Sequence, residues 1–352
     1  MESKYTFVYD PRIEALLDAT LCSIAEEARA HPSFRYLKFL ILGGGYGRGE
    51  GGILKKENGE SALYNDLDFF VISNTTLSWR NNLLNKFYEQ LAKKWRLRLG
   101  IDVDFSKARN VKYIKKRSHI MVWKEMILSP LFLIGDKDEF QKYFSTPSLA
   151  LPPSEAAKLL VNRMSGLFLA KQRLHGSNPL SFEDYDFIAR NTSKAVLACG
   201  DALLIACEKY TLSIQERLQC LKKLHSEKTE GLDELKALYE EAVSFKKTPI
   251  ISQEKDLCSE KLQQATSLCL KTIHSLKQFL NTPVQQTALR KIKGYFLILQ
   301  LKKYFYFLNI DFRLAKNIYF CFIILLMGLL KSPKRASDAL EQAYRKNWNY
   351  IG

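Results

Sequence analysis

Seven of the ten residues from 43 to 52 are glycine, in the stretch GGGYGRGEGG, and no other part of the chain constrains the fold as strongly. The stretch follows a short apolar run, YLKFLIL at residues 36–42, which is typical of a buried strand. Glycine adopts backbone conformations that other residues avoid, and it lets main-chain amides come close to a bound group. The pattern therefore predicts a buried strand that runs into a tight loop able to approach a ligand closely.

Two Asp-x-Asp pairs accompany two later apolar runs. Asp66 stands directly before the run LDFFVI and Asp68 lies within it, while Asp102 and Asp104 both lie in the run IDVDF. Because residues two apart on a strand point to the same side, each pair presents both carboxylates to one face. Four carboxylates in a small volume repel one another unless a cation neutralises them, and hard oxygen ligands suit Mg²⁺ or Mn²⁺. The spacing thus predicts a divalent metal site.

The remaining pattern predicts an α+β chain of two domains. Apolar residues recur at helical spacing at 11–30 and 79–97, which gives the order helix, strand, loop, strand, helix, strand. We expect residues 1–150 to form a domain with a mixed β-sheet and flanking helices. After Pro152-Pro153 the spacing is helical almost throughout, so residues 151–352 should form an all-α domain. The helical segments expected beyond position 180 are 183–208, 213–225, 231–246, 252–280 and 284–308.

Two other glycine motifs fit less well. Gly47, Gly49 and Gly52 match a dinucleotide-binding fingerprint, but that fold needs a helix between the glycines and the next strand. Residues 53–65 are too few for such a helix and contain Gly59. A P-loop is also excluded, because no Gly-Lys-Ser/Thr follows the glycines.

The order of these motifs resembles the DNA polymerase beta-type nucleotidyltransferase superfamily. The matching parts are the loop GGYGR that begins at Gly44, the sequence NDLD at 65–68, and IDVDF at 101–105. The likeness covers roughly residues 36–106 and is strongest to the small bacterial, antibiotic-modifying branch. It implies a Mg²⁺-dependent (or Mn²⁺-dependent) transferase that moves a nucleoside monophosphate from a nucleoside triphosphate, such as ATP, to an acceptor hydroxyl and releases pyrophosphate. The acceptor would be a small molecule, a protein or an RNA end.

The resemblance also implies roles for single residues. Asp66 and Asp68 would bind the metal ions, and Asp102 would be the third catalytic ligand, with Asp104 supporting the metal shell. The nucleotide would lie against Gly44 and Gly45, where the planar guanidinium of Arg48 offers donors for its phosphate oxygens. The helical domain would bind substrate or regulate the enzyme.

Several neighbouring residues have two interpretations. Tyr46 either stacks on a base or fills the loop, and Glu50 reaches either the metal shell or only the loop backbone.

Candidates for a general base are Glu125, Asp136 and Glu155, which are chosen by position alone.

The charge distribution suggests a second class of function. The formal net charge is +16, and residues 281–352 hold 12 Lys and Arg against 3 Asp and Glu. Such a region could attract nucleic acid, an anionic membrane surface or an acidic partner. The alternative to an enzyme is therefore a catalytically silent protein of the same fold that works through its basic C-terminal region. The apolar stretch 318–330 is shorter than the ~20 residues that a membrane span needs, which favours a buried helix or a membrane-surface contact.

Cysteine and histidine usage bears on compartment and on zinc. The seven cysteines form no CxxC and are odd in number, so we expect reduced thiols and a cytoplasmic location. The first residues carry no basic and apolar signal pattern. No His lies three or four residues from another His or Cys, which argues against a zinc site.

Overall fold

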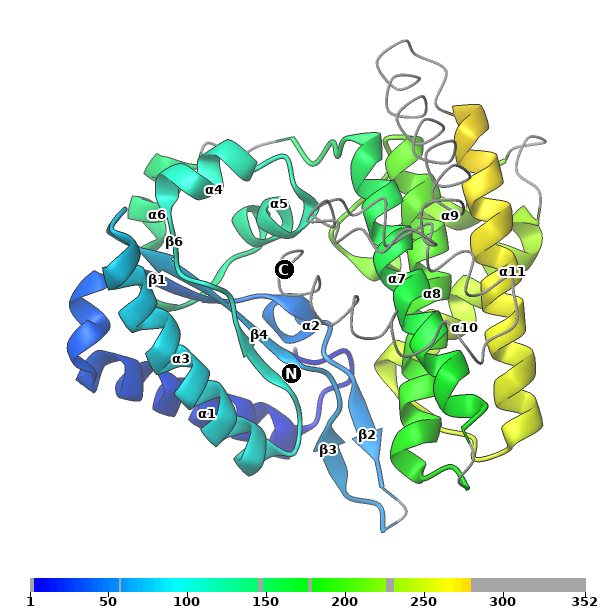
Figure 1. Cartoon of the computed structure of the whole chain (residues 1–352), viewed down its shortest axis with the longest axis horizontal. Helices are drawn as coiled ribbons and strands as arrows, with labels where there is room; N and C mark the ends of the chain where they lie inside the picture. Colours follow the sequence, from blue (N-terminus) through cyan, green and yellow to red (C-terminus); the bar gives the residue numbers. More distant parts are fainter. Residues whose placement is uncertain (1–2, 57, 145–147, 177–178, 226–230, 280–352) are drawn as a thin grey trace, which may run out of the picture. The chain divides into compact units, whose positions relative to one another are not determined.

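The computed structural model describes residues 3–56, 58–144, 148–176, 179–225 and 231–279 (Figure 1). The helix expected at 284–308, the apolar stretch 318–330 and the basic region 281–352 lie outside these residues. The chain forms two compact units, and the structure confirms a mixed α+β class. Among the described residues, the first unit comprises those within Met1–Leu151, Thr211–Glu216 and Ser244–Ile250, and the second comprises those within Pro152–Tyr210, Arg217–Val243 and from Ile251 to Phe279.

A mixed β-sheet forms the centre of the first unit. Its strands are β1 (Leu37–Leu42), β4 (Leu67–Ser73), β5 (Val103–Phe105), β6 (Arg109–Asn110) and β7 (Leu131–Ile134). Their order is β5-β4-β1-β7, and β6 also pairs with β4. β1 is antiparallel to both of its neighbours, whereas β5 and β6 run parallel to β4. The three strands expected from apolar runs are therefore β1, β4 and β5, and they lie next to one another.

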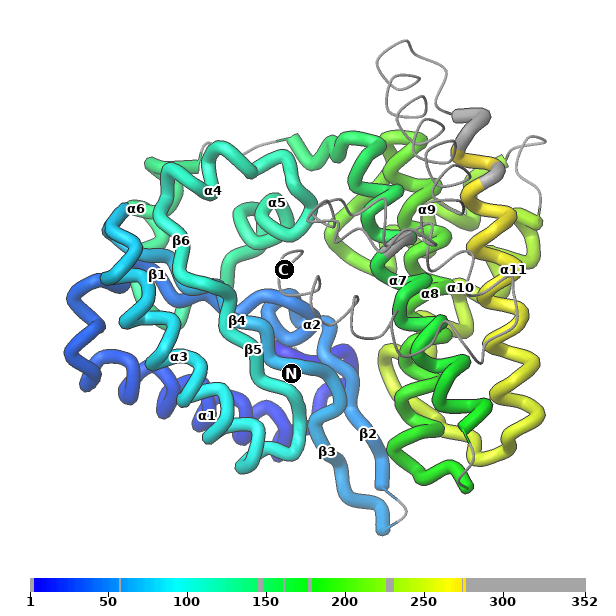
Figure 2. Tube along the Cα trace, in the orientation of Figure 1, coloured from blue at the N-terminus to red at the C-terminus, as the bar shows by residue number. Residues whose placement is uncertain are grey.

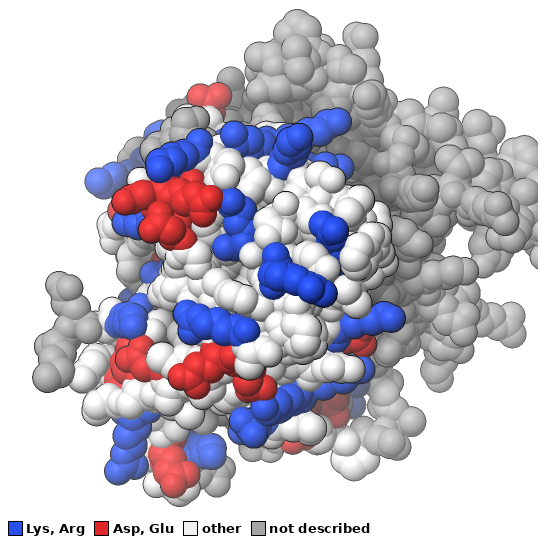
Figure 3. Space-filling view, turned by 90° about the vertical axis from the view of Figure 1, so that its left-hand side faces the viewer, with Lys and Arg blue, Asp and Glu red and all other residues white. Residues whose placement is uncertain are grey.

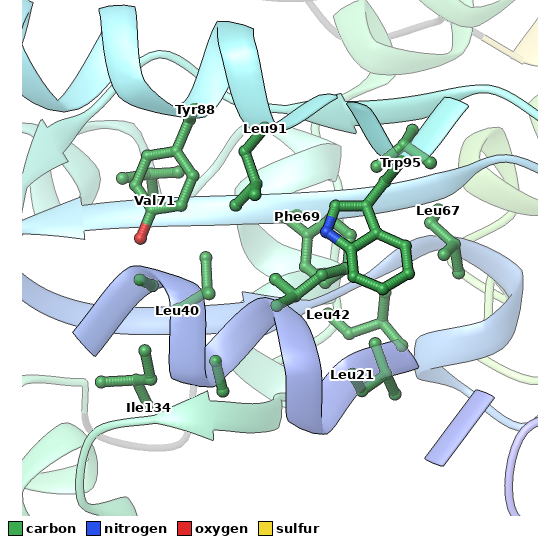
Figure 4. Packing of buried hydrophobic residues seen from close by; sticks show 14 of the residues in the cluster. Leu21, Leu40, Leu42, Leu67, Phe69, Val71, Tyr88, Leu91, Trp95 and Ile134 are labelled. Atoms are coloured by element: carbon green, nitrogen blue, oxygen red, sulfur yellow. The ribbon is translucent and has the colours of Figure 1, made fainter. Parts of the chain in front are cut away.

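Two long helices, α1 (Pro11–Ala30) and α3 (Ser78–Leu99), cover one face of this sheet. Figure 4 shows Tyr88, Leu91 and Trp95 of α3 and Leu21 of α1 directed at the same set of strand side chains. These strand residues are Leu40, Leu42, Leu67, Phe69 and Val71. Alternate residues of each strand thus form one apolar layer, as the period of two requires.

The opposite face is covered by three short helices, α4 (Val111–Arg117), α5 (Met121–Leu128) and α6 (Lys137–Tyr143). Their core side chains are Ile114, Met126, Ile127 and Phe140, which pack on Phe39, Ile41, Phe70 and Ile72 of the strands. Because Phe70 and Ile72 share this face, Asp68 at the same alternation belongs to it as well.

The glycine loop leads into a β-hairpin that the sequence did not predict. Gly44–Gly47 form a short helical turn, α2, and the chain then forms β2 (Ile53–Lys55) and β3 (Ser61–Leu63) before it enters β4. Figure 2 traces this path from the end of β1 through the turn and the hairpin. The segment 53–65 is therefore not helical, as its length indicated.

The described part of the second unit is helical. Its elements are α7 (Pro153–Leu174), α8 (Phe182–Ala206), α9 (Ile214–Lys222), α10 (Leu232–Lys247) and α11 (Lys255–Phe279), of which α9 begins and α10 ends in segments of the first unit. α7, α8 and α11 pack against one another around buried residues such as Leu167, Leu203 and Leu268. The thiols of Cys199 and Cys269 lie 3.4 Å apart and are not joined in a disulfide. Among the described residues, no helix combines the length and apolar character needed to cross a bilayer.

Candidate active site

The pairing of β4 with β5 brings the two Asp-x-Asp motifs together. The strands run parallel with Asp68 directly opposite Asp104, and the amide of Leu67 donates to the carbonyl of Asp102 at 2.9 Å. Val103 and Leu67 belong to the core under α1 and α3, so Asp104 and Asp68, the next residues of β5 and β4, point to the other face of the sheet. Asp102 and Asp66 directly precede these strands, so all four predicted acidic residues lie at the start of two neighbouring strands.

The glycine loop lies directly against Asp68. The amide of Gly43 donates to the Asp68 carbonyl at 2.8 Å, and Gly44 has a φ of +62°. A Cβ at Gly44 would lie 2.5 Å from Oδ2 of Asp68, so any side chain there would displace the carboxylate. Gly45 accepts a hydrogen bond from the amide of Glu50 at 2.8 Å and thereby closes the loop. Glycine at 44 is required both by the backbone conformation and by the carboxylate.

Arg96, near the end of α3, contacts the carboxylates of Asp102 and Asp104, which the sequence did not indicate. Its guanidinium forms ion pairs with Asp104 and, at 3.8 Å from Nε, with Asp102. The pKa of Asp104 lies above its usual value. Partial burial raises this pKa, the positive charge of Arg96 acts to lower it, and the negative charges of Asp102 and Asp66 raise it further. Asp102 and Asp66 therefore lie near enough to Asp104 for their charges to repel its carboxylate.

The donor chemistry of these aspartates fits Mg²⁺ or Mn²⁺, which prefer carboxylate oxygens. In the described part of the chain, however, no three His, Cys, Asp or Glu side chains are arranged so that they could hold a metal ion. Side chains of Asp102 and Asp104 are 70% and 56% exposed and turn toward Arg96. Metal binding would therefore require these carboxylates to leave the guanidinium.

Tyr46 joins the glycine loop to the residues that precede β4. Its side chain is fully buried, and its hydroxyl donates to the carbonyl of Gly52 at 3.0 Å. The same oxygen accepts from the amides of Tyr64 at 3.0 Å and Asn65 at 3.4 Å. The Asn65 side chain makes a second contact with the loop, because its Oδ1 accepts a hydrogen bond from the amide of Gly52 at 2.6 Å. Of the two roles considered for Tyr46, the structure supports filling the loop.

Arg48 lies between two carboxylates. Its Nε is 3.5 Å from Glu50 and its Nη1 is 3.2 Å from Glu125, which lies on α5. Glu50 is also 3.2 Å from Nζ of Lys246 and accepts from the amide of Ile214 at 2.7 Å. Glu50 thus reaches beyond the loop backbone to cationic groups and a distant segment. The hydrogen bonds of Arg48 to Glu50 and Glu125 use its Nε and Nη1.

The three general-base candidates have different surroundings. Glu125 faces the glycine loop through Arg48, as above. Asp136 caps α6 by accepting from the amide of Glu139 at 2.7 Å, and buried Glu155 pairs with Lys158 at 2.6 Å. Only Glu125 is brought into contact with a predicted site residue by these interactions, within the described part of the chain.

The charges on the face shown in Figure 3 do not identify a ligand. On the face shown in Figure 3, Lys and Arg side chains are interleaved with Asp and Glu, which is the pattern of an ordinary mixed-charge surface. Comparisons with known proteins also leave the site unassigned. No family model matches the chain, and neither does any curated protein.

Proposed function

We propose that this chain is a Mg²⁺-dependent nucleotidyltransferase. The observation that carries the proposal is the register of β4 and β5, which sets Asp68 opposite Asp104 while Gly44 lies against the Asp68 carboxylate. A glycine loop and a set of carboxylates on one sheet face are the two parts that such a reaction requires. The loop brings main-chain amides close to phosphate oxygens, and the carboxylates bind the cation that neutralises them.

Asp66 and Asp68 would hold the metal together with either Asp102 or Asp104. The resemblance favours Asp102, but the register favours Asp104, because Asp104 faces Asp68 directly across the strand pair. The bound ion would polarise the α-phosphate and lower the pKa of the attacking hydroxyl. The residues of the glycine loop would bind and orient the triphosphate. Gly44 and Gly45 leave room for the phosphates, and Nη2 of Arg48 supplies a charged donor while Glu50 and Glu125 fix the rest of its guanidinium.

The reaction would be a displacement at the α-phosphorus. The acceptor oxygen forms a bond to that phosphorus, the bond to the bridging oxygen of the β-phosphate breaks, and pyrophosphate leaves with the electron pair. The hydroxyl proton passes to a base or to solvent. The acceptor class stays open among a small molecule, a protein side chain and an RNA end.

A labelling experiment tests the proposal. The purified protein is incubated with each α-³²P-labelled nucleoside triphosphate, Mg²⁺ or Mn²⁺ and a cell extract, and the small-molecule, protein and RNA fractions are separated. We expect label in one fraction with wild type and none with Asp68→Asn. If all fractions stay unlabelled with every triphosphate and both metals, the proposal is wrong.

A further inference from the structure

Two short segments leave the helical part of the chain and pack with the first unit. They are Thr211–Glu216, which includes the start of α9, and Ser244–Ile250, which includes the end of α10. Both make direct contact with Glu50 of the glycine loop. The amide of Ile214 donates to Oε1 of Glu50 at 2.7 Å, and Nζ of Lys246 lies 3.2 Å from Oε2.

The surroundings of Glu50 suit a residue that attaches the two segments to the glycine loop, a role called the anchor below. Its side chain is 7% exposed, and a carboxylate so buried is costly unless charges and donors compensate it. Here an alternating series of charges, Glu125, Arg48, Glu50 and Lys246, runs from α5 through the loop to the second segment. The loop is thus connected by charged groups to parts of the chain almost 200 residues away in sequence.

Apolar contacts bring the second segment to the same place. The ring of Phe245 lies 6.0 Å from that of Tyr64 in an edge-on arrangement, and the Lys246 ammonium lies 5.4 Å from the ring of Phe7. The carbonyl of Lys246 occupies the space where Gly52 would carry a Cβ. The segment is therefore fitted to the end of the glycine loop as well as paired with it.

We propose that Glu50 is a positioning residue through which the segments 211–216 and 244–250 set the conformation of the glycine loop. Because the first segment continues into α9 and the second continues α10, a change in either helix reaches the loop through Glu50. Coupling of this kind is reciprocal, so a ligand on the loop also steadies the two segments. The effect on nucleotide binding rests on the proposed function, whereas the anchoring itself does not.

Hydrogen exchange of the full chain without any ligand tests the anchor. Glu50→Gln keeps the shape of the side chain but removes its charge, and Lys246→Met removes the cation while keeping most of the stem. We expect amide exchange at Ile214 and across 244–250 to become about tenfold faster in Glu50→Gln, and exchange across 244–250 and 43–52 to rise similarly in Lys246→Met. The control is Glu216→Gln, an exposed carboxylate in the first segment whose exchange should match wild type. Unchanged exchange in both test variants would overturn the proposal.

Triphosphate binding tests the coupling. The probes are ATP, GTP, CTP and UTP, each with Mg²⁺, titrated into the same four proteins. Lys246→Met leaves Arg48 and Glu50 in place, yet it should weaken binding of the preferred triphosphate by about tenfold, while Glu216→Gln binds as wild type does. Wild-type affinity in Lys246→Met would contradict the coupling. If wild type binds none of the four, the proposed function fails, and the exchange experiment still decides whether Glu50 is the anchor.

Discussion

At the scale of single residues, the paired aspartates give the most direct prediction. Asp66→Asn or Asp68→Asn should lower nucleotidyl transfer by roughly a hundredfold or more, because each removes a ligand from an ion that contributes several kcal/mol to the transition state. Each change also relieves repulsion among carboxylates, so the melting temperature measured in EDTA should stay level or rise. Normal turnover of either variant at saturating Mg²⁺ would contradict the metal assignment.

The same assay separates Asp102 from Asp104. If the register identifies the third ligand, Asp104→Asn should lose activity as Asp68→Asn does, and Asp102→Asn should retain most of it. The reverse result would support the choice that the resemblance favours. Direct measurement of Mn²⁺ binding by electron paramagnetic resonance gives a second readout that does not depend on turnover.

Arg48→Ala should weaken binding of a nucleoside triphosphate far more than binding of the nucleoside. The reason is that Nη2 offers a charged donor to phosphate oxygens, whereas nothing links Arg48 to a base. Isothermal titration with the two ligands measures the difference. Equal losses for both would show that Arg48 acts only through its ion pairs with Glu50 and Glu125.

Tyr46→Phe should destabilise the first unit without changing its core. The variant removes the oxygen that accepts from the amides of Tyr64 and Asn65, and each buried amide that loses its acceptor costs about 1–3 kcal/mol. Chemical denaturation measures the loss of unfolding free energy. Tyr88→Phe, which removes the hydroxyl of another buried tyrosine in the same core, is the matched control, and a similar loss in both variants would refute the explanation.

The sequence predicted that the four aspartates lie near one another, but it did not indicate which side chains contact them. Asp66, Asp68, Asp102 and Asp104 were predicted because alternation along a strand depends only on neighbouring positions. Arg96 was missed, since its partners depend on where α3 ends relative to β5. The role of Tyr46 was left open for the same reason: burial of its ring is decided by packing with residues up to 19 positions away.

At the scale of elements, the longest periodic patterns were predicted best. The helix expected at 11–30 is α1, Pro11–Ala30, where Asp10 accepts from the amides of Arg12 and Ile13 and Pro11 begins the first turn. The hairpin of β2 and β3 was not predicted, because each strand is three residues long and offers too few positions to show alternation. Short elements of this kind depend on contacts outside their own sequence.

The attachment of the N-terminal segment to α1 should be sensitive to acid. Glu14 of α1 is buried, which acts to raise its pKa, but hydrogen bonds from Thr6, Ser3 and the amides of Tyr5 and Lys4 outweigh burial and lower it. Because the pKa of Glu14 is lower in the folded than in the unfolded chain, its stabilisation is complete above the unfolded-state pKa. It is lost as the pH falls through the folded-state pKa. Thermal melts from pH 7 downward should therefore show that the melting temperature falls below about pH 4.5, and this fall should be smaller in Glu14→Gln than in wild type.

The Glu14→Gln variant should also be less stable than wild type at pH 7, by about 1–3 kcal/mol, because a charged acceptor of several hydrogen bonds is lost. Asp18→Asn is a suitable comparison, since Asp18 lies one turn further along α1 and pairs with exposed Lys4. Identical pH profiles for wild type and Glu14→Gln would show that other carboxylates cause the acid sensitivity.

At the scale of the whole molecule, periodicity could not reveal how the chain is divided. It marked the change to helical spacing after Pro152-Pro153, but it gave no sign that residues 211–216 and 244–250 pack with the first unit. Each segment has only six or seven residues, and its partners, such as Glu50, are more than 160 positions away. Information of this kind lies in the complementarity of buried charges, and a local pattern does not contain it.

The two returning segments imply that residues 1–151 are not the complete folding unit. In a fragment of residues 1–151, Glu50 lacks the Ile214 amide and the Lys246 ammonium, so part of the compensation for its buried charge is gone. Glu50→Gln should therefore lower the melting temperature of the full chain, while in the fragment the same substitution should have a smaller effect or raise it. Circular dichroism melts of the four proteins at one pH measure this difference. An equal fall in the full chain and in the fragment would mean that Glu50 draws its stabilisation from Arg48 and the glycine loop alone.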